Sequence, residues 1–205
     1  MFDFKEFDSV TAMDQALLAD FVKHIYQLLQ YKESLNVAIA TGTTLLPFLY
    51  ALQFEKIPFH KIDLYIVDEY AGLMYTDERS CTFDLYKLLS NRIFDFHSIK
   101  LFTPDNYINE IDLYNSELTK TGLDICVLGV GLDGHVGFCY PPSKILPYKY
   151  YELTALSSTR KQEHVANGWF STIDSVPENI ITLTLWGIMQ SSIVMIGAQY
   201  QKNKM

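Results

Sequence analysis

The stretch that most constrains the fold runs from Asp124 to Phe138 and reads DICVLGVGLDGHVGF. Its first part, Ile125–Val130, is a continuous apolar run, which is typical of a strand buried on both faces of a parallel sheet. The run ends in glycines and is followed by Asp133 and His135. Because ligands bind beyond the carboxyl ends of strands in open α/β sheets, this turn is a candidate site. The alternative is a tight turn in which Asp133 caps a helix and His135 faces solvent.

The composition indicates one folded domain that does not cross a membrane. The 205 residues are 49% hydrophobic, which is enough for a sizeable core. No apolar run approaches the ~20 residues that span a bilayer, and the amino terminus does not resemble a signal peptide. The three cysteines have no metal-like spacing. We therefore expect a single cytoplasmic domain over residues 1–205, without a metal.

The net charge of −8 restricts the class of partner. Nucleic acids and anionic membranes need a basic patch, so neither is expected as the main partner. A small anionic ligand would have to be held by local donors, and backbone N–H groups at a helix start are the simplest source.

Apolar runs that alternate with helical periodicity predict an α/β fold with a mostly parallel sheet and helices on both faces. Thr11 and Asp14 resemble a capping box at the start of the first helix. Residues 139–151 are expected to form an irregular loop. Strands are predicted over 37–40, 62–67, 125–130, 180–185 and 193–196, and helices over 11–31, 45–52, 105–120 and 159–170, with one more carrying Leu85, Leu88, Leu89 and Ile93.

A second candidate site is the loop Thr41-Gly42-Thr43-Thr44, between the first strand and the helix that follows it. Gly42 allows the backbone to curl, so that the threonine hydroxyls and the N–H groups can converge on an anion at the helix start. The loop lacks the Gly-Lys-Ser/Thr ending of a Walker loop. The alternative is a threonine that caps an ordinary strand-to-helix turn.

A third candidate is Asp68-Glu69-Tyr70, directly after the strand 62–67. Neighbouring acids and burial raise the pKa of a carboxyl group toward neutrality, which suits acid/base catalysis. The alternative is a polar turn before a helix capped by Ser80 or Thr82. If the three preceding strands are parallel, all three candidates lie on one edge of the sheet, which suggests a site for a sugar phosphate or a similar anionic metabolite.

Four segments resemble the glucosamine-6-phosphate deaminase (isomerase) family, together with the galactosamine-6-phosphate isomerases. Asp68 to Leu73 matches the deaminase branch better than the related 6-phosphogluconolactonases, in which this motif usually reads GDER. The segments are Ala40–Thr44 against ATGST, Val67–Leu73 against LDEYVGL, Gly129–Phe138 against GxGxDGHIxF, and Ile173–Leu183 against IDxVPxxAIT.

The resemblance implies a Rossmann-like, doubly wound sheet and a reaction that opens an amino-sugar phosphate, isomerises it to the ketose and releases ammonia. Asp68 would then be the base that moves a proton between C1 and C2. His135, oriented by Asp133, would assist ring opening, and the loop of Thr41, Gly42, Thr43 and Thr44 would bind phosphate. An aldose–ketose shift needs only a base and stabilisation of the enediol, so no cofactor is expected.

The chain also departs from the family pattern. Tyr140 stands where the family has a glutamate that completes the ring-opening triad, and a neutral tyrosine cannot stabilise an imidazolium by charge. The phosphate-contacting arginine falls on or next to Gly168. The late phosphate lysine falls near Tyr200, where Lys202 could substitute. The carboxyl-terminal end looks shortened relative to the family.

These departures leave other functions open. A protein of the same fold could bind or sense a sugar phosphate without turning it over, or it could hydrolyse a phosphosugar lactone with His135 activating water. In every case the expected partner is a small-molecule sugar phosphate. The resemblance also allows a homo-oligomer, although no residue pattern marks an interface.

Overall fold

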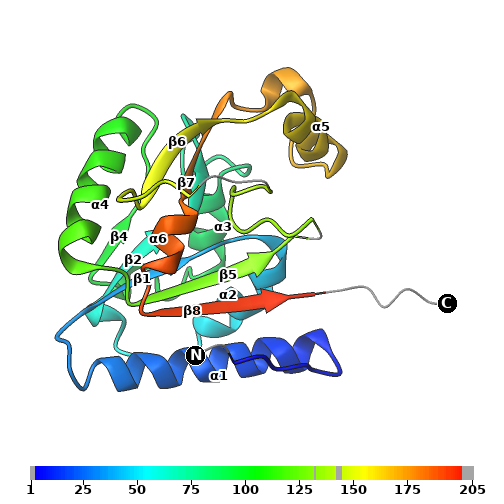
Figure 1. The fold of residues 1–205 in the computed structure, drawn as a ribbon. Coiled ribbons are helices and arrows are strands. Elements are labelled where there is room, and N and C mark those ends of the chain that lie inside the picture. Colours follow the sequence, from blue (N-terminus) through cyan, green and yellow to red (C-terminus); the bar gives the residue numbers. More distant parts are fainter. Residues whose placement is uncertain (1–2, 132, 142–144, 200–205) are drawn as a thin grey trace.

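The computed structural model describes residues 3–131, 133–141 and 145–199 and contains two sheets (Figure 1). In the larger sheet every neighbouring pair of strands is parallel. This arrangement confirms the predicted α/β class with a mostly parallel sheet. Its five strands lie in the order β4 (Ser98–Lys100), β2 (Ile62–Ile66), β1 (Leu35–Ile39), β5 (Ile125–Val130) and β8 (Ile193–Ala198).

Helices cover both faces of the parallel sheet. Helices α1 (Val10–Leu28) and α2 (Leu46–Leu52) lie on one side, and α4 (Tyr107–Thr121) and α6 (Leu185–Met189) lie on the other (Figure 1). The connection from β1 to β2 moves along the sheet in one direction, and the connection from β4 to β5 moves back. Because crossovers between parallel strands are right-handed, these opposite directions place α2 and α4 on opposite faces.

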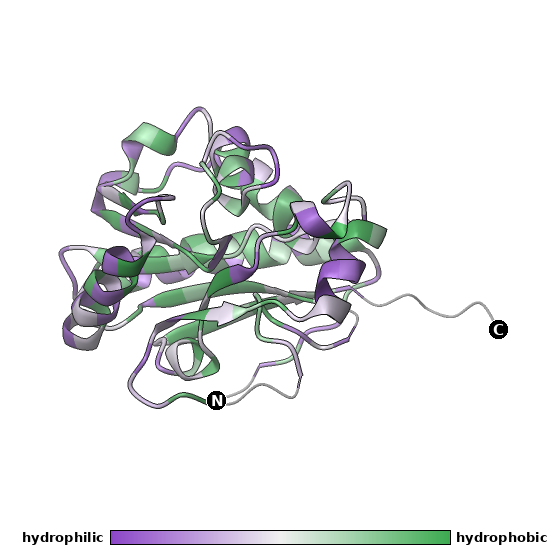
Figure 2. Cartoon of the chain, turned by 90° about the horizontal axis from the view of Figure 1, so that it is seen from above, coloured by the Kyte–Doolittle hydropathy of each residue, from purple (hydrophilic) through white to green (hydrophobic). Residues whose placement is uncertain are grey.

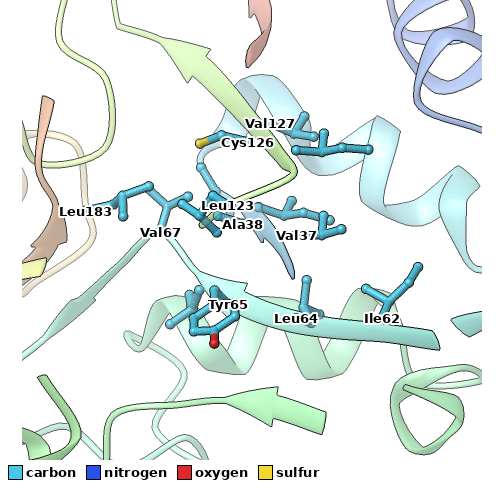
Figure 3. Close-up of a cluster of buried hydrophobic side chains, with 14 of the residues drawn as sticks. Val37, Ala38, Ile62, Leu64, Tyr65, Val67, Leu123, Cys126, Val127 and Leu183 are labelled. Atoms are coloured by element: carbon cyan, nitrogen blue, oxygen red, sulfur yellow. The ribbon is translucent and has the colours of Figure 1, made fainter. Parts of the chain in front are cut away.

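The core surrounds the three central strands and includes side chains of α1, α2 and α4. Figure 3 shows Val37 of β1, Leu64 of β2 and Val127 of β5 in one cluster, and all three are fully buried. Apolar residues follow the central strands, and hydrophilic residues concentrate on the surrounding helices and loops (Figure 2). Burial on both faces explains why these strands are continuous apolar runs rather than alternating ones.

The second sheet is antiparallel and consists of β3 (Asp68–Tyr70), β7 (Asn179–Leu183) and β6 (Tyr151–Ala155). Only Val67 separates β2 from β3, and the Val67 carbonyl accepts a hydrogen bond from the Leu183 N–H at 2.7 Å. The alternative of a polar turn at residues 68–70 is therefore wrong. Pairing with β7 makes this polar segment a strand.

Several predicted boundaries also change. Ser9, not Thr11, caps α1, because its side chain accepts a hydrogen bond from Ala12 N at 3.1 Å. Helix α5 spans Ser158–Ala166 and stops before Phe170, since Gly168 has a φ of +78° and turns the chain. β6 begins at Tyr151, at the end of the segment expected to be a loop.

Helix α3 (Cys81–Leu88) starts as one alternative predicted, with Ser80 as its cap. Gly122 stops α4, as its sequence position suggests, and has a φ of +72°. Across the residues that the structure describes, no helix has the length and apolar character needed to span a bilayer.

Candidate active site

The three candidate segments follow three strands that are neighbours in the sheet. Because β2, β1 and β5 are adjacent and parallel, their carboxyl ends share one edge. A Cβ atom on Gly129, in β5, would lie 3.1 Å from the Thr44 Cβ atom. A Cβ atom on Gly137 would lie 3.1 Å from the Asp68 carboxylate oxygen Oδ2. The structure therefore brings the Thr41–Thr44, Asp68 and Asp133–His135 segments together.

Asp68 is a buried carboxylic acid at this edge. It lies on β3 opposite Thr182 of β7, and 7% of its surface is exposed. Burial, reinforced by the negative charge of Glu69, raises the pKa of Asp68 from 3.8 to about 7, although a hydrogen bond from Cys81 opposes the change. A carboxyl group with this pKa exchanges protons readily near neutral pH.

Glu69 has a different environment from its neighbour. Its carboxylate accepts hydrogen bonds from Ser80 Oγ at 2.6 Å and from the Thr82 N–H at 2.9 Å. It also accepts hydrogen bonds from the backbone N–H groups of Tyr70 and Cys81. The donors of Ser80, Cys81 and Thr82 lie at the start of α3, where a carboxylate satisfies N–H groups and interacts favourably with the positive end of the helix dipole. Glu69 therefore anchors the start of α3, which leaves Asp68 as the candidate for proton transfer.

Asp133 and His135 form a hydrogen-bonded pair within a tight turn. Asp133 Oδ1 lies 2.5 Å from His135 Nδ1, and the His135 carbonyl accepts a hydrogen bond from the Gly131 N–H at 2.9 Å. The imidazole packs so closely on Gly131 that a Cβ atom there would lie 2.2 Å from His135 Cε1. Among the described residues no helix begins at Asp133, so the capping alternative is wrong.

The sequence did not predict the role of Arg160. Its guanidinium donates to Asp133 Oδ2 at 2.8 Å and to Glu163 Oε2 at 2.7 Å. Partial burial opposes ionisation of Asp133, but the hydrogen bonds from His135 and Arg160 lower its pKa to about 2. The Asp133 carboxylate is therefore permanently charged at neutral pH and holds His135 Nδ1. The only hint in the sequence was an Arg–Glu pair at helical spacing near the start of a predicted helix.

Tyr140 lies beside this pair. Its ring centroid is 4.9 Å from that of His135, and the Arg160 guanidinium carbon lies 4.1 Å from the Tyr140 ring centroid. Burial raises the pKa of Tyr140, so the phenol stays neutral. Tyr140 therefore occupies the expected place next to His135, but as a neutral aromatic ring covered by a cation.

The Thr41–Thr44 loop has the predicted position after β1. Thr41 is buried. Burial raises the pKa of the Cys81 thiol, and a hydrogen bond between Cys81 and Thr41 partly opposes this rise. Gly42 precedes a short 3-10 turn over Thr43–Leu45, which leads into α2. The loop is thus linked through Cys81 to the Asp68 carboxylate, which also bonds with that thiol.

The two expected phosphate positions of the carboxyl-terminal half have different outcomes. Gly168 lies in the left-handed turn after α5 and has open space where a Cβ atom would point. Lys202 and Tyr200 lie outside the described residues. No group of His, Cys, Asp and Glu side chains suited to a metal ion occurs within residues 3–131, 133–141 and 145–199.

An open cavity of about 420 Å³ adjoins the site. It lies between residues 138–141, β6 and the start of α5, and its lining includes Tyr140 and Arg160. Asp68 and His135 are not part of this lining. The candidate residues Asp68 and His135 therefore lie at the sheet edge beside this cavity and do not line it.

Comparisons with known proteins agree with this geometry. The profile of the family described as glucosamine-6-phosphate isomerases/6-phosphogluconolactonase matches residues 8–204. A glucosamine-6-phosphate deaminase of Corynebacterium urealyticum is 31% identical over 173 residues, covering 80% of this chain and 65% of the relative. A deaminase of Lysinibacillus sphaericus is 27% identical over 165 residues, covering 80% of this chain and 72% of the relative. The chain thus spans about two thirds of the length of these relatives.

Solved structures share the fold. A monomeric glucosamine-6-phosphate deaminase superposes with a TM-score of 0.76 at 24% identity, covering 95% of this chain and 81% of that one. A 6-phosphogluconolactonase of Shewanella baltica superposes with a TM-score of 0.75 at 18% identity, covering 96% of this chain and 80% of that one. The profile match over nearly the whole chain shows that this protein belongs to the family of glucosamine-6-phosphate isomerases and 6-phosphogluconolactonases.

Proposed function

We propose that the chain is a deaminase/isomerase that converts a hexosamine 6-phosphate into the ketose 6-phosphate and releases ammonia. The observation that carries the proposal is the Asp68 carboxyl group, which is buried at the sheet edge and has a pKa raised to about 7. Proton transfer at carbon is fastest when the pKa of the base lies near the working pH. The names of the matched relatives supply the substrate class.

Asp68 is the base in this proposal. It removes the proton from C2 of the open-chain amino aldose, which leaves an enolamine between C1 and C2. Asp68 then delivers a proton to C1, which gives a 2-imino ketose, and water adds at C2 so that ammonia leaves. Each step moves a proton or adds water, so the sequence requires no oxidant, metal or organic cofactor.

The Asp133–His135 pair opens the sugar ring. Opening requires removal of the proton from the C1 hydroxyl and delivery of a proton to the ring oxygen, which a single imidazole can perform in turn. The 2.5 Å contact with Asp133 Oδ1 fixes His135 Nδ1 as the bonded nitrogen and leaves Nε2 for the sugar. Because Tyr140 is neutral, Asp133 carries the charge that stabilises the imidazolium.

The phosphate is assigned to the loop of Thr41, Gly42, Thr43 and Thr44. Its place after β1, next to β5, puts it on the same sheet edge as Asp68 and His135. Lys202, named on sequence grounds, remains a proposed phosphate contact. The proposal places the enzyme in the cytoplasm, and it does not require a homo-oligomer, since the solved deaminase is described as monomeric.

The direct experiment measures ammonia release from glucosamine 6-phosphate and from galactosamine 6-phosphate by the purified protein. Release from either substrate is expected, and the ratio identifies the epimer. Asp68→Asn should abolish the release while sugar phosphate still raises the melting temperature. Binding without release by the wild type would instead support a sugar-phosphate sensor, and hydrolysis of 6-phosphogluconolactone would support a lactonase.

A further inference from the structure

Three side chains from three separate elements form a hydrogen-bonded chain behind the candidate active site. The Tyr70 hydroxyl lies 3.0 Å from His164 Nδ1, and the Tyr140 hydroxyl lies 3.0 Å from His164 Nε2. Tyr70 belongs to β3, His164 to α5, and Tyr140 to the segment that follows the His135 turn. His164 is 2% exposed, so both of its ring nitrogens are bonded inside the protein.

His164 is neutral at physiological pH. Burial lowers its pKa from 6.5 to about 4, which outweighs the opposing effect of the nearby Glu163 charge. A neutral imidazole has one N–H donor and one acceptor nitrogen, so one tyrosine hydroxyl donates to the ring and the other accepts from it. The hydrogen bonds of this chain therefore all point the same way, and they fix the positions of both tyrosine hydroxyl groups.

The two tyrosines at the ends of this chain lie near two different parts of the proposed active site. Tyr70 lies two residues after Asp68 on the same short strand. Tyr140 packs against the His135 ring at a centroid distance of 4.9 Å. The Arg160 guanidinium, which lies over the Tyr140 ring, donates to Asp133, the partner of His135. Movement of Tyr140 would therefore remove a ring contact of His135 and would also disturb the contact between Tyr140 and Arg160, which holds Asp133.

An aromatic cluster keeps this chain in place. The Tyr70 ring contacts Phe138 at 5.1 Å and Phe170 at 5.0 Å between centroids. Trp169 packs on the His164 ring at 5.0 Å. Because these rings exclude water, each hydrogen bond of the chain is costly to break without a replacement partner.

We propose that His164 is a positioning residue that holds the Tyr140 hydroxyl and, through the Tyr140 ring, the imidazole of His135. The inference rests on the proposed function for its catalytic consequence. His164 does not contact the reacting atoms in this account. It sets where the ring-opening imidazole stands relative to the base.

Two substitutions of His164 separate this role from general packing. The Asn side chain ends near the position of Nδ1, which faces Tyr70, and the Gln side chain ends near the position of Nε2, which faces Tyr140. His164→Gln therefore preserves the contact with Tyr140, and His164→Asn loses it. We expect His164→Asn to lower kcat about tenfold with little change in KM, and His164→Gln to stay within about threefold of the wild type.

A double-mutant cycle tests the route through Tyr140. Tyr140→Phe keeps the ring beside His135 but removes the hydroxyl group. If His164 acts through that hydroxyl, His164→Asn should reduce kcat only slightly further in the Tyr140→Phe background. Equal losses in Asn and Gln variants that follow their melting temperatures, or fully additive losses in the cycle, would overturn the inference.

A readout without turnover separates this inference from the proposed reaction. The NMR signals of the His135 ring should shift in His164→Asn and stay near their wild-type positions in His164→Gln. If the wild type releases no ammonia but the His135 signals behave in this way, the proposed function fails and the positioning role stands. Unchanged His135 signals in both variants would contradict the positioning role, whatever the activity.

Discussion

Replacing Asp68 with Asn should make the protein more stable at high pH while removing its activity. The Asp68 pKa is raised from 3.8 to about 7 by burial and by the charge of Glu69. An acid whose pKa is raised on folding stabilises the folded state below its unfolded pKa, and this stabilisation is lost as the pH rises through the folded pKa. The wild type therefore loses stability between about pH 4 and pH 7, because in this range the carboxyl group ionises in the unfolded chain but stays protonated in the folded protein.

The size of the effect follows from the pKa change. Each unit of pKa corresponds to about 1.36 kcal/mol, so a rise from 3.8 to about 7 amounts to roughly 4 kcal/mol. Asn has nearly the same shape as Asp and does not ionise. The free energy of unfolding of Asp68→Asn relative to the wild type should therefore increase by up to about 4 kcal/mol between pH 4 and pH 8.

Urea unfolding of both proteins at pH 4 and pH 8 measures this quantity, since other titrating groups are common to both and cancel in the difference. Asp112→Asn, at an exposed position on α4, is the matched control and should show no such dependence. A difference between Asp68→Asn and the wild type that is constant within about 1 kcal/mol from pH 4 to pH 8 would refute the reasoning. The Asp68 carboxyl group would then not be held in an environment that penalises its charge.

Three further substitutions test the surrounding geometry. Gly131→Ala should lower kcat at least tenfold, because the new Cβ atom would lie 2.2 Å from Cε1 of the His135 ring and displace that ring. Wild-type kinetics in this variant would contradict the close packing. Glu69→Ala should lower the free energy of unfolding by about 3 kcal/mol, since it leaves buried donors at the start of α3 unpaired, whereas the exposed Glu78→Ala should leave it unchanged. A loss below 1 kcal/mol in urea unfolding of Glu69→Ala would refute that role. Arg160→Gln should reduce kcat by about tenfold. It should change the free energy of unfolding by less than about 1 kcal/mol, because the Arg160 ion pairs are partly exposed. A large decrease in melting temperature with unchanged kcat would show that Arg160 has a structural role instead.

The sequence predicted four of the five strands of the parallel sheet, because these strands are recognisable locally, and it missed the short β4 (Ser98–Lys100). Ile125–Val130 is apolar throughout and is the strand β5 with the same bounds. The sites after β1, β2 and β5 follow from the same signal, since parallel neighbours end at a common edge. The prediction that the three segments lie at one edge of the sheet is confirmed by the strand order.

The antiparallel sheet could not be found in this way. Asp68-Glu69-Tyr70 is a polar segment that reads as a turn, and it becomes a strand only because it pairs with Ile180–Thr182 far along the chain. Propensity and periodicity describe neighbours in sequence and carry no information on such pairing. The same limit explains why the two adjacent carboxylates looked equivalent, although Glu69 is bonded to the start of α3 and Asp68 is not.

The supporting residues of the site were missed for a related reason. Arg160 and His164 lie on α5, whose sequence shows only an ordinary exposed helix with an Arg–Glu pair. Their contacts with Asp133, Tyr70 and Tyr140 depend on where α5 lies relative to both sheets. Only the tertiary structure brings these groups together.

The central claim is that Asp68 moves a proton between C2 and C1 of an open-chain hexosamine 6-phosphate. The reaction run in deuterium oxide and followed by NMR tests it most directly, because a carboxyl base that exchanges with solvent between removal and return delivers deuterium to carbon. We expect the wild type to place deuterium at C1 of the ketose phosphate, and Asp68→Asn to place none. Ammonia release and deuterium incorporation by Asp68→Asn at the wild-type level would contradict the assignment of Asp68 as the base.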